Sequence, residues 1–248
     1  MSITNLYEDG AAPSSGHERA HQRVLLIGAS RGLGLALARE WAERGTHVVG
    51  TVRGTGRTAL HELADDFPGR IEVETVDITE PRQVAALRDR LSAREFDLLF
   101  VNAGVTNEPE GTVAETSTDE FVRVMVTNAL SPVRVVEALH DLVEPAGTIG
   151  VMSSGQGSVT NNERGGHEVY RGSKAALNTF MRSYAARHRD DDRALVLMAP
   201  GWVRTEMGGP DARLGIHESI PNIVRTLDGL RGTRGLRYVD YLGRTVPW

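Results

Sequence analysis

Short apolar runs alternate with amphipathic segments of ten or more residues along most of this 248-residue chain. The runs with the composition of buried strands are residues 23–28, 46–52, 71–76, 96–101, 148–152 and 194–198. Helical periodicity marks residues 33–44, 80–93, 117–143 and 168–188, with Pro132 a candidate kink. This alternation predicts a single doubly wound, Rossmann-type α/β domain over residues 23–248, with a parallel sheet of about seven strands flanked by helices. Its ligand site should lie at the carboxyl ends of the strands.

Composition excludes several other classes of protein. A content of 40% hydrophobic and 25% charged residues is typical of globular domains and argues against disordered and fibrous chains. The net charge of −5 argues against nucleic-acid binding, and the absence of cysteine excludes disulfides and cysteine-based metal sites. We find no membrane-spanning run, secretory signal or metal-binding pattern, and we expect a cytoplasmic protein whose residues 1–22 form a flexible tail.

Three glycines stand between the first strand and the first helix. Gly28, Gly32 and Gly34 have the spacing GxxxGxG. Glycine allows a tight turn there and brings backbone N–H groups close to a pyrophosphate at the helix N-terminus. The position directly after a strand therefore predicts a dinucleotide-binding turn, although glycine-rich turns also precede helices that bind nothing.

The residues at the end of the second predicted strand indicate which dinucleotide the chain binds. NAD-binding folds place an acidic residue there for the ribose 2′-hydroxyl, but no carboxylate lies between Gly45 and Leu60. Arg53 stands there instead, and Arg31 lies in the glycine turn. Both suit a 2′-phosphate, so the pattern favours NADP(H) over NAD(H). The alternative is that both are solvated surface cations in an arginine-rich chain.

A tyrosine and a lysine lie four residues apart at the start of a predicted helix. Lys174 is the only lysine in the chain, and the i, i+4 spacing places it on the same helix face as Tyr170. An ammonium beside a phenol favours the phenolate and so predicts a lowered pKa for Tyr170.

Five motifs together resemble the classical short-chain dehydrogenase/reductase family. They are the glycine turn, Asn102-Ala103-Gly104, Ser153-Ser154, the YxxxK of Tyr170 and Lys174, and Pro200-Gly201. The sequences YRGSKAALN (170–178), PGWVRTEMGG (200–209) and YLGRTVPW (241–248) are similar to its C-factor-like carbonyl reductase branch. The resemblance runs from about residue 23 to the end of the sequence.

The resemblance implies four catalytic residues. Tyr170 would be the general acid or base, Ser154 would hold the substrate oxygen, Lys174 would bind the nicotinamide ribose and lower the Tyr170 pKa, and Asn128 would hold a water in the proton relay. The residues implied in cofactor binding are Gly28, Ser30, Arg31, Gly32, Leu33, Gly34, Arg53, Asp77, Ile78, Asn102, Ala103, Gly104, Tyr170, Lys174, Pro200, Gly201, Val203 and Thr205.

Some of these residues have simpler structural interpretations. Asn128 could lie on a helix surface, Asp77 could cap the following helix, and either serine of the pair 153–154 could face the substrate. Tyr170 stands sixteen positions after Ser154, further than is commonest in the family, so the intervening loop is expected to shape the substrate entrance. Residues 205–216 would form a mobile lid over the nicotinamide.

The sequence thus predicts an NADP(H)-dependent oxidoreductase that reduces a ketone or aldehyde, or runs the reverse reaction. A dinucleotide-binding regulatory or signalling protein with vestigial reductase activity is the alternative, and an isomerase or dehydratase is a third possibility. The family packs its two long helices across a two-fold axis, which implies a homodimer or homotetramer.

Overall fold

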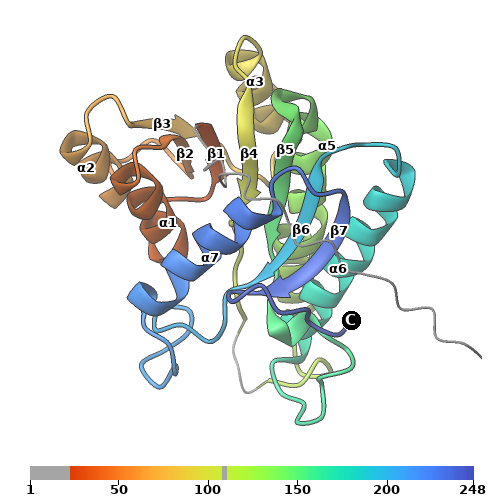
Figure 1. Ribbon diagram of the computed structural model, residues 1–248. Helices are drawn as coiled ribbons and strands as arrows, with labels where there is room; N and C mark the ends of the chain where they lie inside the picture. Colours follow the sequence, from red (N-terminus) through yellow and green to blue (C-terminus); the bar gives the residue numbers. More distant parts are fainter. Residues whose placement is uncertain (1–22, 108–110) are drawn as a thin grey trace, which may run out of the picture.

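The computed structural model describes residues 23–107 and 111–248, so the predicted tail at 1–22 lies outside the described residues (Figure 1). In this part of the chain, seven parallel strands form one sheet in the order β3-β2-β1-β4-β5-β6-β7. The strands are β1 (Arg23–Ile27), β2 (His47–Val52), β3 (Ile71–Thr75), β4 (Phe96–Val101), β5 (Val143–Met152), β6 (Ala194–Ala199) and β7 (Gly235–Asp240). The strand order reverses between β1 and β4, and the fold class predicted from the sequence is confirmed.

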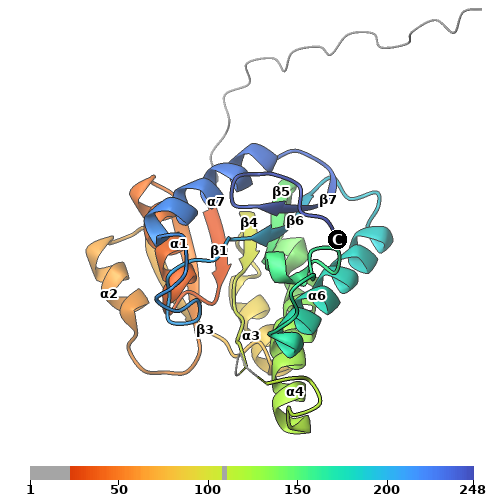
Figure 2. The same cartoon turned by 90° about the horizontal axis from the view of Figure 1, so that it is seen from below.

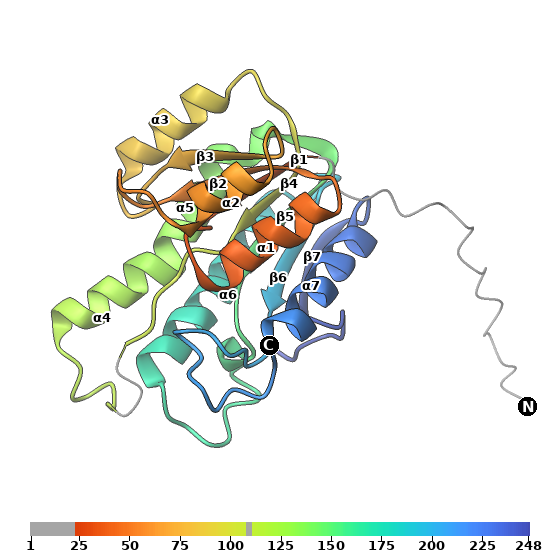
Figure 3. The ribbon, with the colours of Figure 1, turned by 90° about the vertical axis from the view of Figure 1, so that its left-hand side faces the viewer.

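Helices cover both faces of the sheet (Figures 1 and 3). They are α1 (Gly32–Glu43), α2 (Ala59–Asp66), α3 (Pro81–Leu91), α4 (Thr118–Met125), α5 (Ser131–Leu139), α6 (Glu168–Arg187) and α7 (Ile216–Leu230). Buried side chains of α1, α2 and α7 share one hydrophobic cluster, and those of α3, α5 and α6 share another. Within the described residues, no helix is long and apolar enough to cross a bilayer.

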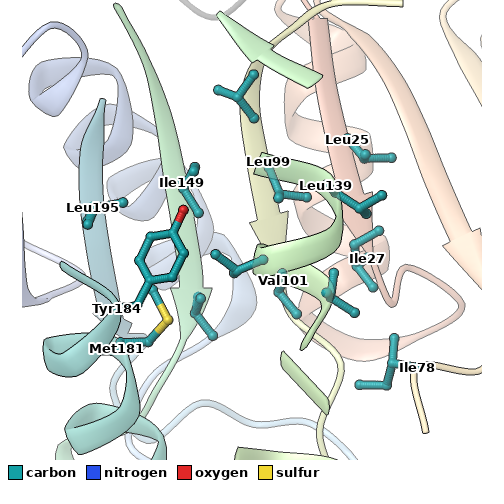
Figure 4. Packing of buried hydrophobic residues seen from close by; sticks show 14 of the residues in the cluster. Leu25, Ile27, Ile78, Leu99, Val101, Leu139, Ile149, Met181, Tyr184 and Leu195 are labelled. Atoms are coloured by element: carbon teal, nitrogen blue, oxygen red, sulfur yellow. The ribbon is translucent and has the colours of Figure 1, made fainter. Parts of the chain in front are cut away.

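Strand side chains point alternately into these two clusters. In β1, Leu25 and Ile27 belong to the cluster under α5 and α6, whereas Val24 and Leu26 belong to the one under α1 and α7. Figure 4 shows Leu25 and Ile27 on the same side as Leu139 of α5. Each fully buried side chain of this size contributes about 1.5–3 kcal/mol to folding. Burial on both faces explains why the sequence shows continuous apolar runs rather than alternation.

The predicted helix over residues 117–143 is interrupted. Between α4 and α5 lies a π-helical turn, η1 (Val126–Leu130), and a 3-10 turn, η2 (His140–Leu142), follows α5. At the end of η1 the N–H of Ser131 donates to the carbonyl of Val126, five residues earlier. Pro132 has no N–H with which to continue the regular ladder to Asn128, which accounts for the break near the proline.

Three elements were not assigned individually from the sequence. The helices α2 and α7 and the strand β7 lie in segments whose sequence pattern predicts no helix or strand on its own. The segment of α2 is short and polar, and α7 has Pro221 inside it. Both features weaken the helical signal.

Candidate active site

The predicted site residues gather at one edge of the sheet, where the carboxyl ends of the strands lie (Figure 2). Most of them stand in the segments directly after β1, β2, β3, β4, β5 and β6, and the others are on η1 and at the starts of α1 and α6. Parallel strands bring such segments together whatever their distance along the chain. The site expected from the sequence is therefore one region of the fold.

The glycine turn is so close to neighbouring backbone that Gly28 and Gly34 have no space for a side chain. Gly28 has a φ of +88°, and a Cβ on it would lie 2.8 Å from atoms of Ala103. A Cβ on Gly34 would lie 2.0 Å from the carbonyl oxygen of Gly28. The side-chain amide of Asn102 donates to that same oxygen at 2.7 Å. Asn102 thus joins the end of β4 to the turn after β1, and glycine is required at both ends of the turn.

Helix α1 begins within this turn, at Gly32. Its N-cap, Arg31, forms no side-chain cap, and its first turn carries no acidic residue. Unsatisfied N–H groups at a helix N-terminus favour an anion. Ser30 and Leu33 are partly exposed beside them.

Two arginines flank the turn. Arg31 forms an ion pair with Glu206 at 2.8 Å, in which both side chains are about three-quarters exposed, at 76% and 77%. Such a pair is weak and easily exchanged for another partner. Arg53 is exposed just beyond β2, whose Thr51 hydroxyl accepts a hydrogen bond from the N–H of Gly28 at 2.9 Å. Both cations are thus accessible near the turn.

The carboxylate of Asp77 is engaged in a local turn. Its Oδ1 accepts hydrogen bonds from the N–H of Thr79 at 2.9 Å and from the Thr79 hydroxyl at 2.7 Å. The N–H of Asp77 donates to Gln83 at 2.9 Å, and Ile78 is buried. Asp77 therefore does not cap the following helix, whose N-cap is Glu80 and has no side-chain cap, and it is half-buried at the edge of the site.

Lys174 is buried at the centre of the site. Its side chain is 3% exposed, its Nζ donates to the carbonyl oxygen of Met152 at 2.9 Å, and it lies 5.9 Å from the centroid of the Tyr170 ring. Burial lowers the pKa of Lys174 to about 8. A Cβ on Gly104 would lie 3.5 Å from this Nζ, so glycine lets the chain after β4 pass close to the ammonium.

The two serines after β5 have different partners. Ser153 is buried, and its hydroxyl donates to Oδ1 of Asn178 at 2.6 Å. The Ser154 hydroxyl instead forms a hydrogen bond with the phenol of Tyr170. Of the pair, Ser154 is therefore the one beside the tyrosine, as the sequence motif indicates.

The pKa of Tyr170 differs from the sequence-based expectation. Burial raises the pKa of its hydroxyl, and the hydrogen bond with Ser154 opposes that shift only in part. Lys174 directs its Nζ to Met152, so in this arrangement burial outweighs any stabilisation of the phenolate. The lowering of the Tyr170 pKa that the sequence suggested is thus not found, and the phenol is protonated at neutral pH.

Asn128 is fully buried and is not a helix-surface residue. Its Oδ1 accepts from the N–H of Val105 at 2.8 Å, and its Nδ2 donates to the Val105 carbonyl at 2.8 Å and to the Ser173 hydroxyl at 3.0 Å. Ser173 in turn donates to the carbonyl of Tyr170 at 2.7 Å. The side chain of Asn128 therefore joins the segment after β4 to the helix that carries the tyrosine.

The segment after β6 folds over the same edge. Gly201 follows Pro200 with a φ of +84°, and the backbone of Val203 pairs with Leu214, which closes the intervening loop. Inside that loop the Thr205 hydroxyl accepts from the N–H of Gly208 at 3.0 Å. The predicted lid is thus a closed loop with its own hydrogen bonds.

Two residues beside the site were missed from the sequence. Tyr238 of β7 donates its hydroxyl hydrogen to the carbonyl of Ser154, and Asn178 holds Ser153. Asn178 lies four residues after Lys174 on α6, so extending the Tyr170–Lys174 spacing by one turn would have found it. No local pattern marks Tyr238, because its place depends on how β7 joins the sheet.

Comparisons with known proteins agree with this arrangement. The family model described as short chain dehydrogenase matches residues 22–213. A short-chain dehydrogenase/reductase from Burkholderia multivorans with bound NADP is 61% identical, with a TM-score of 0.90 over 92% of this chain and 100% of that one. A carbonyl reductase from Pseudomonas aeruginosa PAO1 in complex with NADP is 34% identical, with a TM-score of 0.84 over 93% and 100%. C-signal of Myxococcus xanthus is 37% identical over 154 residues, which are 61% of this chain and 92% of that protein. The chain therefore belongs to the classical short-chain dehydrogenase/reductase family and to its C-factor-like branch.

Proposed function

We propose that this protein is an NADP(H)-dependent oxidoreductase that reduces a ketone or aldehyde to an alcohol, or runs the reverse reaction, with Tyr170 as general acid or base. The observation that carries the proposal is the hydrogen bond between Tyr170 and Ser154, with the ammonium of Lys174 5.9 Å from the tyrosine ring. Two adjacent hydroxyls with a cation in the same region suit an oxygen atom that gains negative charge as it is reduced.

Observations of this chain fit the cofactor. Gly28 and Gly34 of the glycine turn have no space for a Cβ, the N-terminus of α1 carries no side-chain cap or acid, and Arg31 and Arg53 are exposed beside them. The N-terminus would hold the pyrophosphate, and the two arginines would bind the 2′-phosphate. Lys174 would bind the ribose hydroxyls next to the nicotinamide. Support also comes from the Burkholderia and Pseudomonas relatives that contain NADP.

The residues of the chain supply positioning and the proton. When bound, the cofactor supplies the hydride. The Ser154 hydroxyl would donate a hydrogen bond to the substrate oxygen, and Tyr170 would give that oxygen its hydroxyl proton. A phenol carries its proton at neutral pH, so Tyr170 has a proton to give in the direction of reduction; burial, which raises its pKa, makes it a weaker acid than a solvated tyrosine. Asn128 would keep the start of α6, and with it Tyr170, fixed against the segment after β4.

The test is a titration with NADPH and with NADH, followed by nicotinamide fluorescence, and then turnover of a panel of ketones and aldehydes. We expect tighter binding of NADPH and a loss of about 10²–10⁴-fold in kcat for Tyr170→Phe without loss of binding. Binding without turnover of any carbonyl compound would overturn the reductase proposal in favour of a regulatory role. Failure to bind either nucleotide would overturn the cofactor site as well.

We also propose that the protein is a homodimer through the face formed by α5 and α6. An apolar groove there is lined by Val84 of α3, Val133 of α5 and Phe180 of α6, and Phe180 is exposed. Arg134 and Glu137 on its border are of opposite charge, so a two-fold axis could pair them. Light scattering should give twice the chain mass for the native protein and the single mass for Phe180→Glu.

A further inference from the structure

The segment 241–248 turns back and runs beside β7. Thr245 forms an antiparallel bridge with Val239, and the N–H of Val246 donates to the carbonyl of Tyr238 at 2.9 Å. Gly243, with a φ of +79°, makes the reversal possible. The side chain of Val246 is buried in the core, which fixes this return segment. Its last residue lies next to α6 (Figures 1 and 2).

Trp248, at the end of this segment, holds the loop that separates Ser154 from Tyr170. Its backbone oxygen accepts hydrogen bonds from the N–H of Thr160 at 3.0 Å and from the Ser158 hydroxyl at 3.4 Å. The same Ser158 oxygen accepts from the N–H of Asn161 at 3.1 Å. Two positions of the loop, Ser158 and Thr160, are thus bonded directly to one residue that is distant in sequence, and Asn161 is bonded to the first of them.

The indole ring of Trp248 is placed by two neighbours. The guanidinium carbon of Arg182 lies 4.4 Å from the ring centroid, and the centroid of the Tyr238 ring lies 5.4 Å away at an interplanar angle of 48°. A cation over an indole ring and a tilted aromatic pair are both attractive arrangements. The ring is still 37% exposed, so it is a surface clamp rather than part of the core.

Tyr238 connects this clamp to the candidate active site. Its hydroxyl donates to the carbonyl of Ser154, and Ser153 and Asn178, which are bonded to each other, lie beside that hydroxyl. Trp248 and Tyr238 therefore hold the two ends of one short segment, residues 154–160. That segment carries the serine hydroxyl that faces Tyr170 and the exposed Val159.

We propose that Trp248 is a positioning residue, which together with Tyr238 fixes residues 154–160 and so sets the Ser154 hydroxyl and the substrate side of the site. No contact of Trp248 reaches the glycine turn, Arg31 or Arg53, so the clamp acts on the carbonyl substrate and not on cofactor binding. The activity part of this inference rests on the proposed reductase function. The structural part, a loop held by Trp248, does not.

The first measurement follows the loop itself. Arg164 is exposed in the same loop, four residues after Thr160, and is a site for trypsin. Limited proteolysis of the full chain, read by mass spectrometry for cleavage after Arg164, should be at least five-fold faster in Trp248→Ala. Trp248→Phe, which keeps an aromatic ring between Arg182 and Tyr238, should be cleaved nearly as slowly as the native protein.

A matched control is available in the same segment. Leu242 is 47% exposed and lies beside α7, where it lines a shallow groove with Thr226 and Leu230. Leu242→Ala should leave cleavage after Arg164 unchanged. If Leu242→Ala and Trp248→Ala accelerate cleavage equally, general loosening of residues 241–248 is the cause and the clamp is overturned. The clamp is likewise overturned if Trp248→Ala is cleaved at the native rate.

The second measurement separates positioning from stability. With a carbonyl substrate, Trp248→Ala should lower kcat/KM about ten-fold while the Kd for NADPH stays within two-fold of native, and Trp248→Phe should restore most of kcat/KM. An equal loss of NADPH affinity, or a native kcat/KM in Trp248→Ala, would contradict the positioning role. If the native protein turns over no carbonyl compound, the reductase proposal fails, and the proteolysis result alone decides whether Trp248 holds the loop.

Discussion

The Nζ atom of Lys174 donates a hydrogen bond across 2.9 Å to the backbone oxygen of Met152, the last residue of β5. This contact fixes the only lysine of the chain where the sheet ends, and it takes the ammonium almost entirely out of water. Burying a charge costs free energy unless its partners compensate. The lysine is therefore retained against stability, as expected of a functional residue.

Replacing Lys174 by methionine should separate function from stability. A pKa moved from 10.5 to about 8 corresponds to about 3 kcal/mol of penalty on the charged form. Removing the charge would therefore stabilise the fold, but the lost hydrogen bond to the Met152 carbonyl offsets about 1–3 kcal/mol of this gain. We expect Lys174→Met to melt at the native temperature or a few degrees above it, with carbonyl reduction slowed by about two orders of magnitude or more. A much lower melting temperature together with full activity would contradict this.

The pH dependence of unfolding should reveal the same lysine. Because the pKa of Lys174 is about 8 in the folded chain and near 10.5 in the unfolded chain, the folded state loses this proton first. The free-energy cost of burying the charged ammonium is fully present below pH 8. It is relieved as the pH rises from about 8 to about 10.5, so the contribution of Lys174 to the free energy of unfolding becomes more favourable over this window. Urea unfolding of the native protein and Lys174→Met should thus give a difference in stability that changes over this window. A difference in stability that does not change with pH would mean that burial does not shift the pKa of Lys174.

Replacing Arg53 by alanine should weaken NADPH binding selectively. The side chain is exposed at the end of β2, where we propose that the 2′-phosphate binds. Loss of a charge-assisted contact to phosphate should raise the Kd for NADPH about ten- to a hundred-fold. The Kd for NADH, which has no such phosphate, should change less than two-fold. Equal effects on both nucleotides would place Arg53 elsewhere in the site.

Glu206 should compete with the cofactor for Arg31. The two side chains form an exposed ion pair at 2.8 Å, and one guanidinium cannot serve a 2′-phosphate fully while it binds this carboxylate. We expect Glu206→Gln to tighten NADPH binding about two- to five-fold at low salt, with the gain fading as ionic strength rises. Isothermal titration at two salt concentrations measures both effects. Weaker binding in Glu206→Gln would show that the carboxylate assists the cofactor instead.

A single methyl group on Gly34 should abolish nucleotide binding. Its Cβ would lie 2.0 Å from the carbonyl oxygen of Gly28, a distance that no rearrangement of side chains can relieve. The turn must open, which removes the close approach of backbone to pyrophosphate. Gly56→Ala is the matched control, because a Cβ there meets nothing within 4 Å. Fluorescence titration of NADPH should show binding for the control alone.

Most of the fold could be predicted because its strands are buried on both faces. Runs such as 96–101 are apolar throughout, and the structure ends β4 at the predicted residue. The boundaries of the other predicted strands agree to within two residues, except that β5 begins earlier, at Val143. Family membership inferred from the motif order is confirmed by the match over residues 22–213. The cytoplasmic location and the assembly stay predictions.

The candidate site could be predicted where a motif is local, and not where it depends on the tertiary fold. The spacing of Tyr170 and Lys174 is a property of one helix, so their common face could be predicted. The pKa of Tyr170 depends on how much water the packed site admits, and its expected direction was wrong. Tyr238 and Trp248 reach the loop only because β7 joins the sheet and the following segment folds back.

The π-helical turn at residues 126–130 adds one residue to what would otherwise be a regular turn of a long helix. One residue corresponds to about 100° of helical rotation, so α4 and α5 present different faces from those of a continuous helix. That phase change turns Asn128 inward to Val105 while Leu130, two residues later, stays exposed. Deleting one residue from this turn would remove that phase change, although Pro132 would still lack an N–H for the ladder, and it would rotate Asn128 away from Val105 and Ser173. The helix would remain, and the start of α6 would lose its attachment.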